Sequence, residues 1–175
     1  LSDTDGVRSS IGQGTHLFSV SQLARYAATI ANRGTSYNLT LLNKLTDSEG
    51  NTIEEYSASV YNEMDIADTT WNVIQEGMHQ VALDTDAFEG LDLSIAGKTG
   101  TAQQSKSHPN HALFMGYAPY EDPQIAITIR IANGYTSANA ATMAADIFKY
   151  YFGLAEEDEI LTGTASQATT EVIND

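Results

Sequence analysis

The residues best suited to chemistry form the run GKTGT at residues 97–101, inside an expected strand from 93 to 103. Lysine supplies a compact positive charge and threonine hydroxyls supply hydrogen-bond donors, so the run is suited to binding an anion. Gly100 is unusual within a strand, where glycine often marks a close approach of another group to the backbone. The backbone amide of Thr101 is a further donor for an oxyanion. The alternative is structural: an edge strand protected by Lys98, with Gly100 as a bulge.

Two histidines, His108 and His111, have a spacing that occurs in metal sites. Pro109 between them breaks the helix that would align them, no third histidine lies nearby, and the chain has no cysteine. We therefore predict no metal and no cofactor. We expect both histidines in the loop that follows the Lys98 strand, near the mouth of a cleft, where His111 is a candidate for contact with substrate.

Further segments accompany the KTG triplet. In chain order these are SIGQG (10–14), SVSQLARYAATIANRGT (19–35), AGKTGTAQ (96–103) and HALFMGYAP (111–119). With the Ile-rich stretch that follows, they resemble the C-terminal part of the transpeptidase domain of class B penicillin-binding proteins, over residues 9–152. KTG is a motif of these enzymes and of serine β-lactamases. GQG ahead of the helix favours class B, whereas Ser19-Val20-Ser21 departs from the Thr-Pro-Leu frequent in the family.

The resemblance implies an enzyme that cross-links peptidoglycan. In that family a serine attacks the D-Ala-D-Ala end of a stem peptide, D-Ala leaves, and the acyl group passes to an amine on a neighbouring strand. β-Lactams imitate this substrate and trap the serine. By resemblance, the catalytic residues here are Lys98, for positive charge and proton handling, and Thr101, whose amide donates to the oxyanion. The substrate-binding residues are Thr99 and Thr101, for the carboxylate, with Gly100, which lets the acyl group lie against the strand, and His111.

The family's nucleophile is missing from this chain. It belongs to an S-x-x-K motif, and no serine here is followed three residues later by lysine. S-x-N, the third family motif, matches at 36–38 and 137–139, but it should precede GQG, so we interpret both matches as structural. We therefore expect this chain to form one wall of an active site, the wall that carries KTG. The isolated chain should form no acyl-enzyme. The missing N-terminal half of the domain is the expected partner.

Two alternatives remain open. The first is a relative of β-lactamases or D,D-carboxypeptidases, which share KTG. The second is a non-catalytic peptide-binding module of the same fold. An S-x-x-K followed by S-x-N in the natural reading frame upstream of Leu1 would establish the transpeptidase; because the chain begins with Leu1 rather than Met, we interpret it as a piece of a longer protein.

Hydrophobic periodicity predicts an α+β fold with an antiparallel meander packed with helices. The expected helices are 20–33, 68–83 and one from 137, with a hairpin over 39–56 and strands at 93–103, 112–118 and 124–132. Ser19 with Gln22 forms a capping box, and Asp68 and Ser137 are the other expected caps. The outer edge of strand 124–132 is expected to be unpaired, and its Ile-rich face to promote self-association.

Composition limits the partners. The 175 residues contain 8 Lys and Arg against 23 Asp and Glu, a net charge of −15, which opposes binding to nucleic acid or to an anionic membrane surface. We divide the chain into the transpeptidase portion, 1–153, and an acidic, Thr- and Ser-rich tail, 154–175, that we expect to be largely disordered. The resemblance implies a place on the extracytoplasmic face of the bacterial membrane, with stem peptides and β-lactams as ligands.

Overall fold

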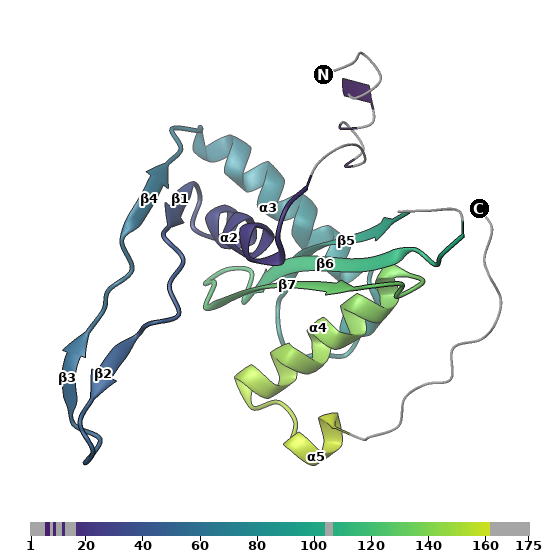
Figure 1. The fold of residues 1–175 in the computed structure, drawn as a ribbon. Coiled ribbons are helices and arrows are strands. Elements are labelled where there is room, and N and C mark those ends of the chain that lie inside the picture. Colours follow the sequence, from purple (N-terminus) through teal and green to yellow (C-terminus); the bar gives the residue numbers. More distant parts are fainter. Residues whose placement is uncertain (1–5, 8, 10–11, 13–16, 104–106, 162–175) are drawn as a thin grey trace.

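The computed structural model describes residues 6–7, 9, 12, 17–103 and 107–161. Its centre is a three-stranded antiparallel sheet in the order β5-β6-β7 (Figure 1). The strands are β5 (Ala96–Ala102), β6 (His111–Ala118) and β7 (Ile125–Ile131). They confirm the predicted meander, and the register from β5 to β6 runs without a shift. GKTGT therefore lies in a regular edge strand, and the bulge at Gly100 is not present.

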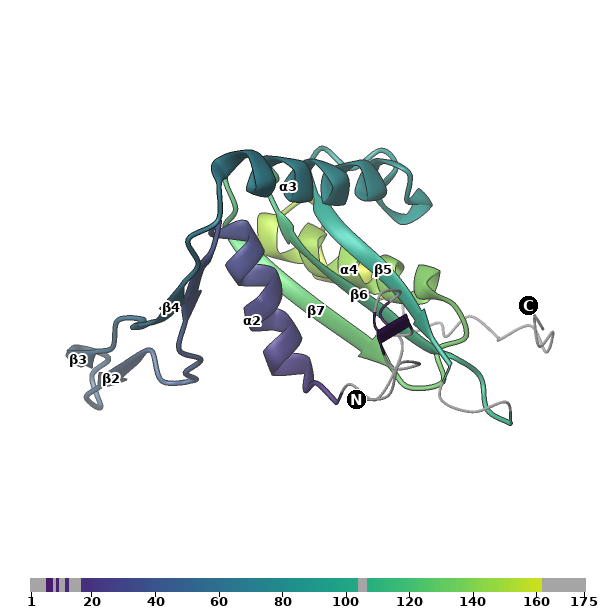
Figure 2. The same cartoon turned by 90° about the horizontal axis from the view of Figure 1, so that it is seen from above.

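Helices cover both faces of this sheet (Figures 1 and 2). One face is covered by α2 (Val20–Ala31), which packs on β6 and β7, and by α3 (Asp68–Leu83), which packs along β5. The opposite face is covered by α4 (Ser137–Phe152), which contacts all three strands. Figure 2 shows α2 in front of the sheet and α4 behind it.

Each face has its own apolar core, because successive side chains of a strand point to opposite faces. The core on the α4 face contains Phe114 and Phe148, both fully buried. It also contains Phe88 of the 3₁₀ helix η1 (Asp86–Phe88). Phe114 needs glycine beside it, since a Cβ at Gly97 would lie 2.5 Å from its Cζ. The α2 and α3 side contains Ile30, Trp71, Met78, Ala96 and Tyr117.

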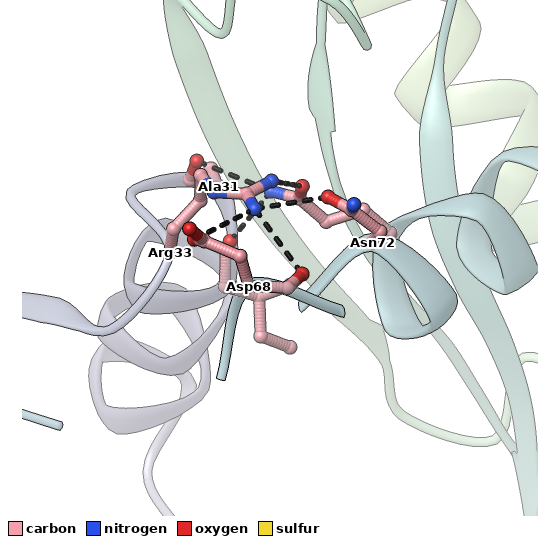
Figure 3. A network of polar contacts seen from close by, with 6 residues as sticks. Ala31, Arg33, Asp68 and Asn72 are labelled. Atoms are coloured by element: carbon pink, nitrogen blue, oxygen red, sulfur yellow. Dashed lines mark hydrogen bonds and ion pairs between the residues drawn. The ribbon is translucent and has the colours of Figure 1, made fainter. Parts of the chain in front are cut away.

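The polar junction between α2 and α3 lies around Arg33 (Figure 3). The predicted capping box of Ser19 and Gln22 begins α2, and Asn32 ends it. Arg33 then takes a left-handed φ of 53° and Gly34 a φ of 105°. Glycine is required there, since a Cβ at Gly34 would lie 2.9 Å from Cζ2 of Trp71.

A long arm extends from the body between α2 and α3 (Figure 1). The predicted hairpin is confirmed at its tip, where β2 (Lys44–Thr46) pairs with β3 (Thr52–Glu55) and Gly50 has a φ of 88°. At its base β1 (Thr35–Tyr37) pairs with β4 (Val60–Glu63), which the sequence did not predict.

Two expected helix caps were wrong by one residue. The N-cap of α3 is Ala67 rather than Asp68, which is the first helical residue and binds Arg33. The N-cap of α4 is Thr136 rather than Ser137, because Thr136 has the extended backbone and accepts the amide of Ala138.

Two expectations concern the C-terminal part of the chain. The Ile-rich face of β7 is not open, because its isoleucines pack with α4 in the core; only the outer edge of the strand lacks a partner strand in the described part of the chain. Gly153, with a φ of 63°, ends α4, and residues 157–160 form the short helix α5 (Glu157–Ile160). Residues 162–175 lie outside the described part, so disorder there stays a prediction. No helix in the described ranges is long and apolar enough to cross a bilayer.

Candidate active-site strand

β5 carries the GKTGT run along an open edge. It pairs only with β6, so among residues 17–103 and 107–161 no strand covers its outer side. Because Ala96 packs with the α2 and α3 core, alternation places Lys98 and Gly100 on that face and Thr99 and Thr101 on the α4 face. The strand therefore presents a charge, an open glycine and two hydroxyls along one free backbone edge.

Lys98 is exposed and forms no ion pair with another residue in the described part of the chain. Its Nζ donates to the carbonyl oxygen of Thr99 at 2.9 Å, which holds the ammonium beside the backbone of β5. Within the described ranges the two ion pairs are Arg33 with Asp68 and Lys149 with Asp146, so neither involves Lys98. In a chain of net charge −15, Lys98 is a local exception that favours an anionic ligand.

Gly100 has no packing reason to be glycine. Among the described residues, a Cβ there would meet only Cβ of Leu113, at 3.6 Å, which is ordinary van der Waals contact. Gly116 on the neighbouring strand differs, since a Cβ there would lie 2.5 Å from the carbonyl oxygen of Ala96. No described side chain therefore forces this position to be glycine, and none of them crowds the space beside it.

Thr101 contacts the start of α4. Its Oγ1 accepts a hydrogen bond from the backbone N–H of Ser137 at 3.3 Å, across 36 positions of sequence. An amide N–H can only donate, so the Thr101 oxygen is the acceptor and its own hydrogen remains available to a further group. The side chain is exposed at the end of the strand.

His111 begins β6 opposite Ala102, close to the end of the GKTGT run. Its Nδ1 accepts the backbone N–H of Asn133 at 3.1 Å, so the ring hydrogen lies on Nε2. His108 Nδ1 lies 3.1 Å from Ser107 Oγ in the preceding loop. In the described part of the chain, no three His, Asp or Glu side chains group as a metal site would require.

The turn between β7 and α4 belongs to this end of the sheet and was missed by sequence analysis. Asn133 and Tyr135 have left-handed φ values of 54° and 63°. The N–H of Tyr135 donates to the carbonyl of Asn110 at 3.0 Å, and Asn139 Nδ2 donates to the carbonyl of Gly134 at 2.8 Å. The dipeptide Asn133-Gly134 is a turn signal that could have located it.

The two S-x-N matches have structural contacts. Ser36 is buried in β1, and Asn38 Nδ2 donates to Ser59 Oγ at 3.0 Å across the arm. Ser137 begins α4, and Asn139 binds the turn before it. Asn38 and Asn139 thus make local contacts, and the structural interpretation of both matches stays a prediction.

Comparison with known families identifies the domain type. The family described as "Penicillin binding protein transpeptidase domain" matches residues 3–151. Penicillin-binding protein 2B of Streptococcus pneumoniae is 29% identical over 147 residues, which cover 74% of this chain and 22% of that protein. Peptidoglycan D,D-transpeptidase PbpA of Mycolicibacterium smegmatis is 32% identical over 149 residues, covering 79% of this chain and 29% of that protein. The chain thus spans about a quarter of these curated relatives.

Solved structures agree with the sequence matches. The structure of penicillin-binding protein 2B from S. pneumoniae strain R6 superposes with a TM-score of 0.77 at 27% identity, over 88% of this chain and 28% of that one. Pseudomonas aeruginosa PBP2 in complex with WCK 5153 gives 0.67 at 28% identity, over 87% and 34%. A ceftriaxone acyl-enzyme complex of penicillin-binding protein A from Mycobacterium tuberculosis gives 0.73 at 24% identity, over 81% and 34%, and supports the fold alone.

Proposed function

Because this chain belongs to the penicillin-binding protein transpeptidase family, we propose that it is the KTG-bearing part of a peptidoglycan D,D-transpeptidase. The observation that carries the proposal is the open edge of β5, on which Lys98, Gly100 and Thr101 are all accessible. In the proposed reaction a serine oxygen forms an ester with the penultimate D-Ala of a stem peptide. The bond to the terminal D-Ala breaks, and an amine of a second stem peptide then takes the acyl group and frees the serine.

Each residue of the β5 edge has a proposed role. Lys98 supplies the positive charge beside the nucleophile, and its freedom from carboxylate partners in the described ranges supports this role. Thr99 and Thr101 hold the terminal carboxylate through their hydroxyls. The open space at Gly100 admits the acyl group, and the Thr101 amide donates to the oxyanion. His111 contacts substrate at the end of the edge.

The nucleophile must come from residues that this chain does not contain, since its sequence has no S-x-x-K. The share of the relatives that it spans supports this, because most of each relative lies beyond the match. We propose that the N-terminal half of the domain adds strands to the outer edge of β7, which no strand covers in the described part of the chain. The proposed location is the extracytoplasmic face of the bacterial membrane, where peptidoglycan is assembled.

β-Lactams are the proposed inhibitors, and they provide the test. The isolated chain is incubated with a fluorescent penicillin and examined by intact-protein mass spectrometry. We expect no covalent adduct, since no activated serine is present. A stoichiometric penicilloyl adduct would contradict the assignment of this chain as a wall without a nucleophile.

The natural full-length protein tests the role of Lys98. We expect wild type to form a stable penicilloyl enzyme and Lys98→Ala to acylate at least about tenfold more slowly, because a charge-assisted contact is lost. Lys44→Ala is the matched control, since Lys44 is an exposed lysine in β2 on the arm, away from β5 (Figure 1). Rapid turnover of penicillin would indicate a β-lactamase relative instead, and absence of any adduct would indicate a non-catalytic module.

A further inference from the structure

The N-terminus of α4 meets the end of β5 at a hydrogen bond between Ser137 and Thr101. We propose that Ser137 is a positioning residue: its backbone N–H fixes the Thr101 hydroxyl so that the hydroxyl hydrogen is directed to the substrate carboxylate. This inference rests on the proposed function, because it assigns a means of orienting a residue that the proposal uses. The Ser137 nitrogen lies 3.3 Å from Thr101 Oγ1.

The start of a helix is where such a donor is available. The first N–H groups of an α-helix have no partner within the helix and carry partial positive charge. In α4 the side chain of the N-cap Thr136 accepts the N–H of Ala138, so the N–H of Ser137, one residue earlier, is left to Thr101. This donor occupies a lone pair of the Thr101 oxygen and leaves its hydrogen to bind an anion.

The turn before α4 is held firmly enough to act as a support. Tyr135 and Asn133 both have left-handed backbone angles, which persist only where the surroundings enforce them. Their N–H groups donate to Asn110 and His111 at the start of β6. Gly134 between them lies against the sheet, since a Cβ there would be 2.8 Å from Cβ of Ala112.

The helix itself cannot shift easily relative to the sheet. Four alanines on its inner face, Ala140, Ala141, Ala144 and Ala145, are almost completely buried against the strands. Small side chains allow this close approach and leave little space for sliding. The Ser137 amide is therefore fixed relative to β5 by both the turn and the helix.

Ser137→Pro removes this N–H, together with the Ser137 hydroxyl, and preserves the helix. Proline is favoured at the first helical position, and the residue before proline prefers an extended backbone. Thr136 already has φ −130° and ψ 149°. The ring carbon takes the place of the amide hydrogen, so the Thr101 hydroxyl must rotate away. The matched control is Val20→Pro, a proline at the first position of α2 after Ser19, whose φ is −74° and ψ 157°.

The measurement is the rate of acylation of the natural full-length protein by benzylpenicillin and by its methyl ester, which lacks the carboxylate. We expect Ser137→Pro to slow acylation by benzylpenicillin about tenfold, the scale of a hydrogen bond to a charged group, and Val20→Pro to change it less than about twofold. With the methyl ester, Ser137→Pro and wild type should react alike. In a Thr101→Val background, Ser137→Pro should add no further loss, because its partner is already gone.

The failures of the two proposals are distinguishable. If Thr101→Val slows acylation and Ser137→Pro does not, the positioning role is wrong and the proposed function stands. The positioning role is also wrong if Ser137→Pro slows acylation further in the Thr101→Val background, or if it slows the reaction of the methyl ester as much as that of benzylpenicillin. In either case the proline would act by distorting the site in general. If neither Lys98→Ala nor Thr101→Val affects acylation, the proposed function fails. Should Ser137→Pro not fold, replacing the amide between Thr136 and Ser137 by an ester removes the same N–H and should give the same tenfold loss.

Discussion

Arg33 and Gln75 join α2 to α3: Nη1 of Arg33 donates to Oε1 of Gln75 at 2.9 Å, and Gln75 Nε2 donates to the carbonyl oxygen of Ile30 at 2.9 Å. Figure 3 shows the network around Arg33, which also includes Asp68 and Asn72. Gln75 is buried, and its amide gives the Ile30 carbonyl at the end of α2 a second donor besides the backbone N–H of Arg33. The joint fixes α3, which packs along the candidate site strand β5.

Arg33→Met tests this joint. It keeps an unbranched side chain and removes all donors, so the oxygen of the buried Gln75 loses its partner. We expect the free energy of unfolding to fall by about 1–3 kcal/mol, chiefly from that loss. The ion pair adds little, because the Asp68 side chain is 87% exposed. Urea denaturation measures the change, with the exposed Arg130→Met as control; equal stability of the two variants would contradict the role of the joint.

Tyr117 is a buried phenol that limits stability at high pH. It is fully buried, and its hydroxyl forms no hydrogen bond of good geometry with a described residue. Burial raises its pKa to about 12, although the Gln75 amide lies near enough to oppose part of that rise. The pKa of Tyr117 in the folded state lies above the ordinary value of 10.0, so the unfolded chain loses this proton first as the pH rises. The free energy of unfolding is therefore unaffected by Tyr117 below pH 10 and falls as the pH rises from 10 toward 12.

Tyr117→Phe removes the unpartnered hydroxyl. We expect the variant to be more stable by about 1 kcal/mol at neutral pH, and the gain to grow above pH 10. Thermal unfolding between pH 7 and 11 measures both effects. Tyr61→Phe, at an exposed position on the arm, is the control. A destabilised Tyr117→Phe would mean that the hydroxyl has a partner in the protein.

Glu76 on α3 connects that helix to the turn after β6. Hydrogen bonds from Gln80 Nε2, at 2.7 Å, and from the Tyr120 hydroxyl, at 3.0 Å, lower the pKa of the Glu76 carboxyl below 4.5. A lowered folded pKa means that this contribution to stability is present above pH 4.5 and is lost as the pH falls through the folded pKa. Tyr120 also stacks on His79, with ring centroids 4.2 Å apart.

Tyr120→Phe keeps the ring on His79 and removes the bond to Glu76. We expect the Glu76 pKa to move up toward its ordinary value, measurable by NMR titration of the side-chain carboxyl. The stability difference from wild type should be largest near neutral pH and should shrink under acid conditions. Tyr56→Phe, on the hairpin, should leave the Glu76 pKa unchanged; an unshifted pKa in Tyr120→Phe would show that Gln80 alone accounts for the lowering.

His111 accepts a hydrogen bond from the turn before α4 and, in the proposed function, contacts the substrate. Asparagine can place an acceptor where Nδ1 lies, whereas leucine cannot. We expect His111→Asn to melt like wild type but to acylate a few-fold more slowly in the full-length protein, and His111→Leu to lose about 1 kcal/mol of stability as well. Wild-type acylation of His111→Asn would mean that His111 only supports the turn.

The open edge of β7 predicts association of the isolated chain. No strand covers this edge in the described part of the chain, and unpaired strand edges template pairing with other chains. We expect light scattering to show concentration-dependent oligomers, with slow amide exchange along 124–132. The full-length protein, in which further strands would cover the edge, should not associate in this way. A monomer at high concentration with fast exchange over 124–132 would contradict the prediction.

Local sequence determined much of this protein. The alternating isoleucines of β7, the turn after β6 and the capping box of α2 depend on neighbouring residues, so their patterns predicted the meander and the helices. The KTG triplet and the segments around it likewise indicated the family, which the match over 3–151 shows. The sequence did not show which residues of the GKTGT run lie on which face of the sheet. That assignment required the two cores, one on each face, that the structure shows.

Tertiary structure decided the contacts between distant segments. Thr101 and Ser137 are 36 positions apart, and Arg33 and Gln75 are 42 apart. No local pattern encodes such pairs, since each depends on how helices pack on the sheet. The same reason explains the wrong caps: Asp68 is drawn to Arg33 across the joint, and Thr136 rather than Ser137 has the extended backbone that a cap requires. The sequence indicated that the candidate site residues lie on β5, and the packing of α3 and α4 on the sheet determined which residues contact that strand.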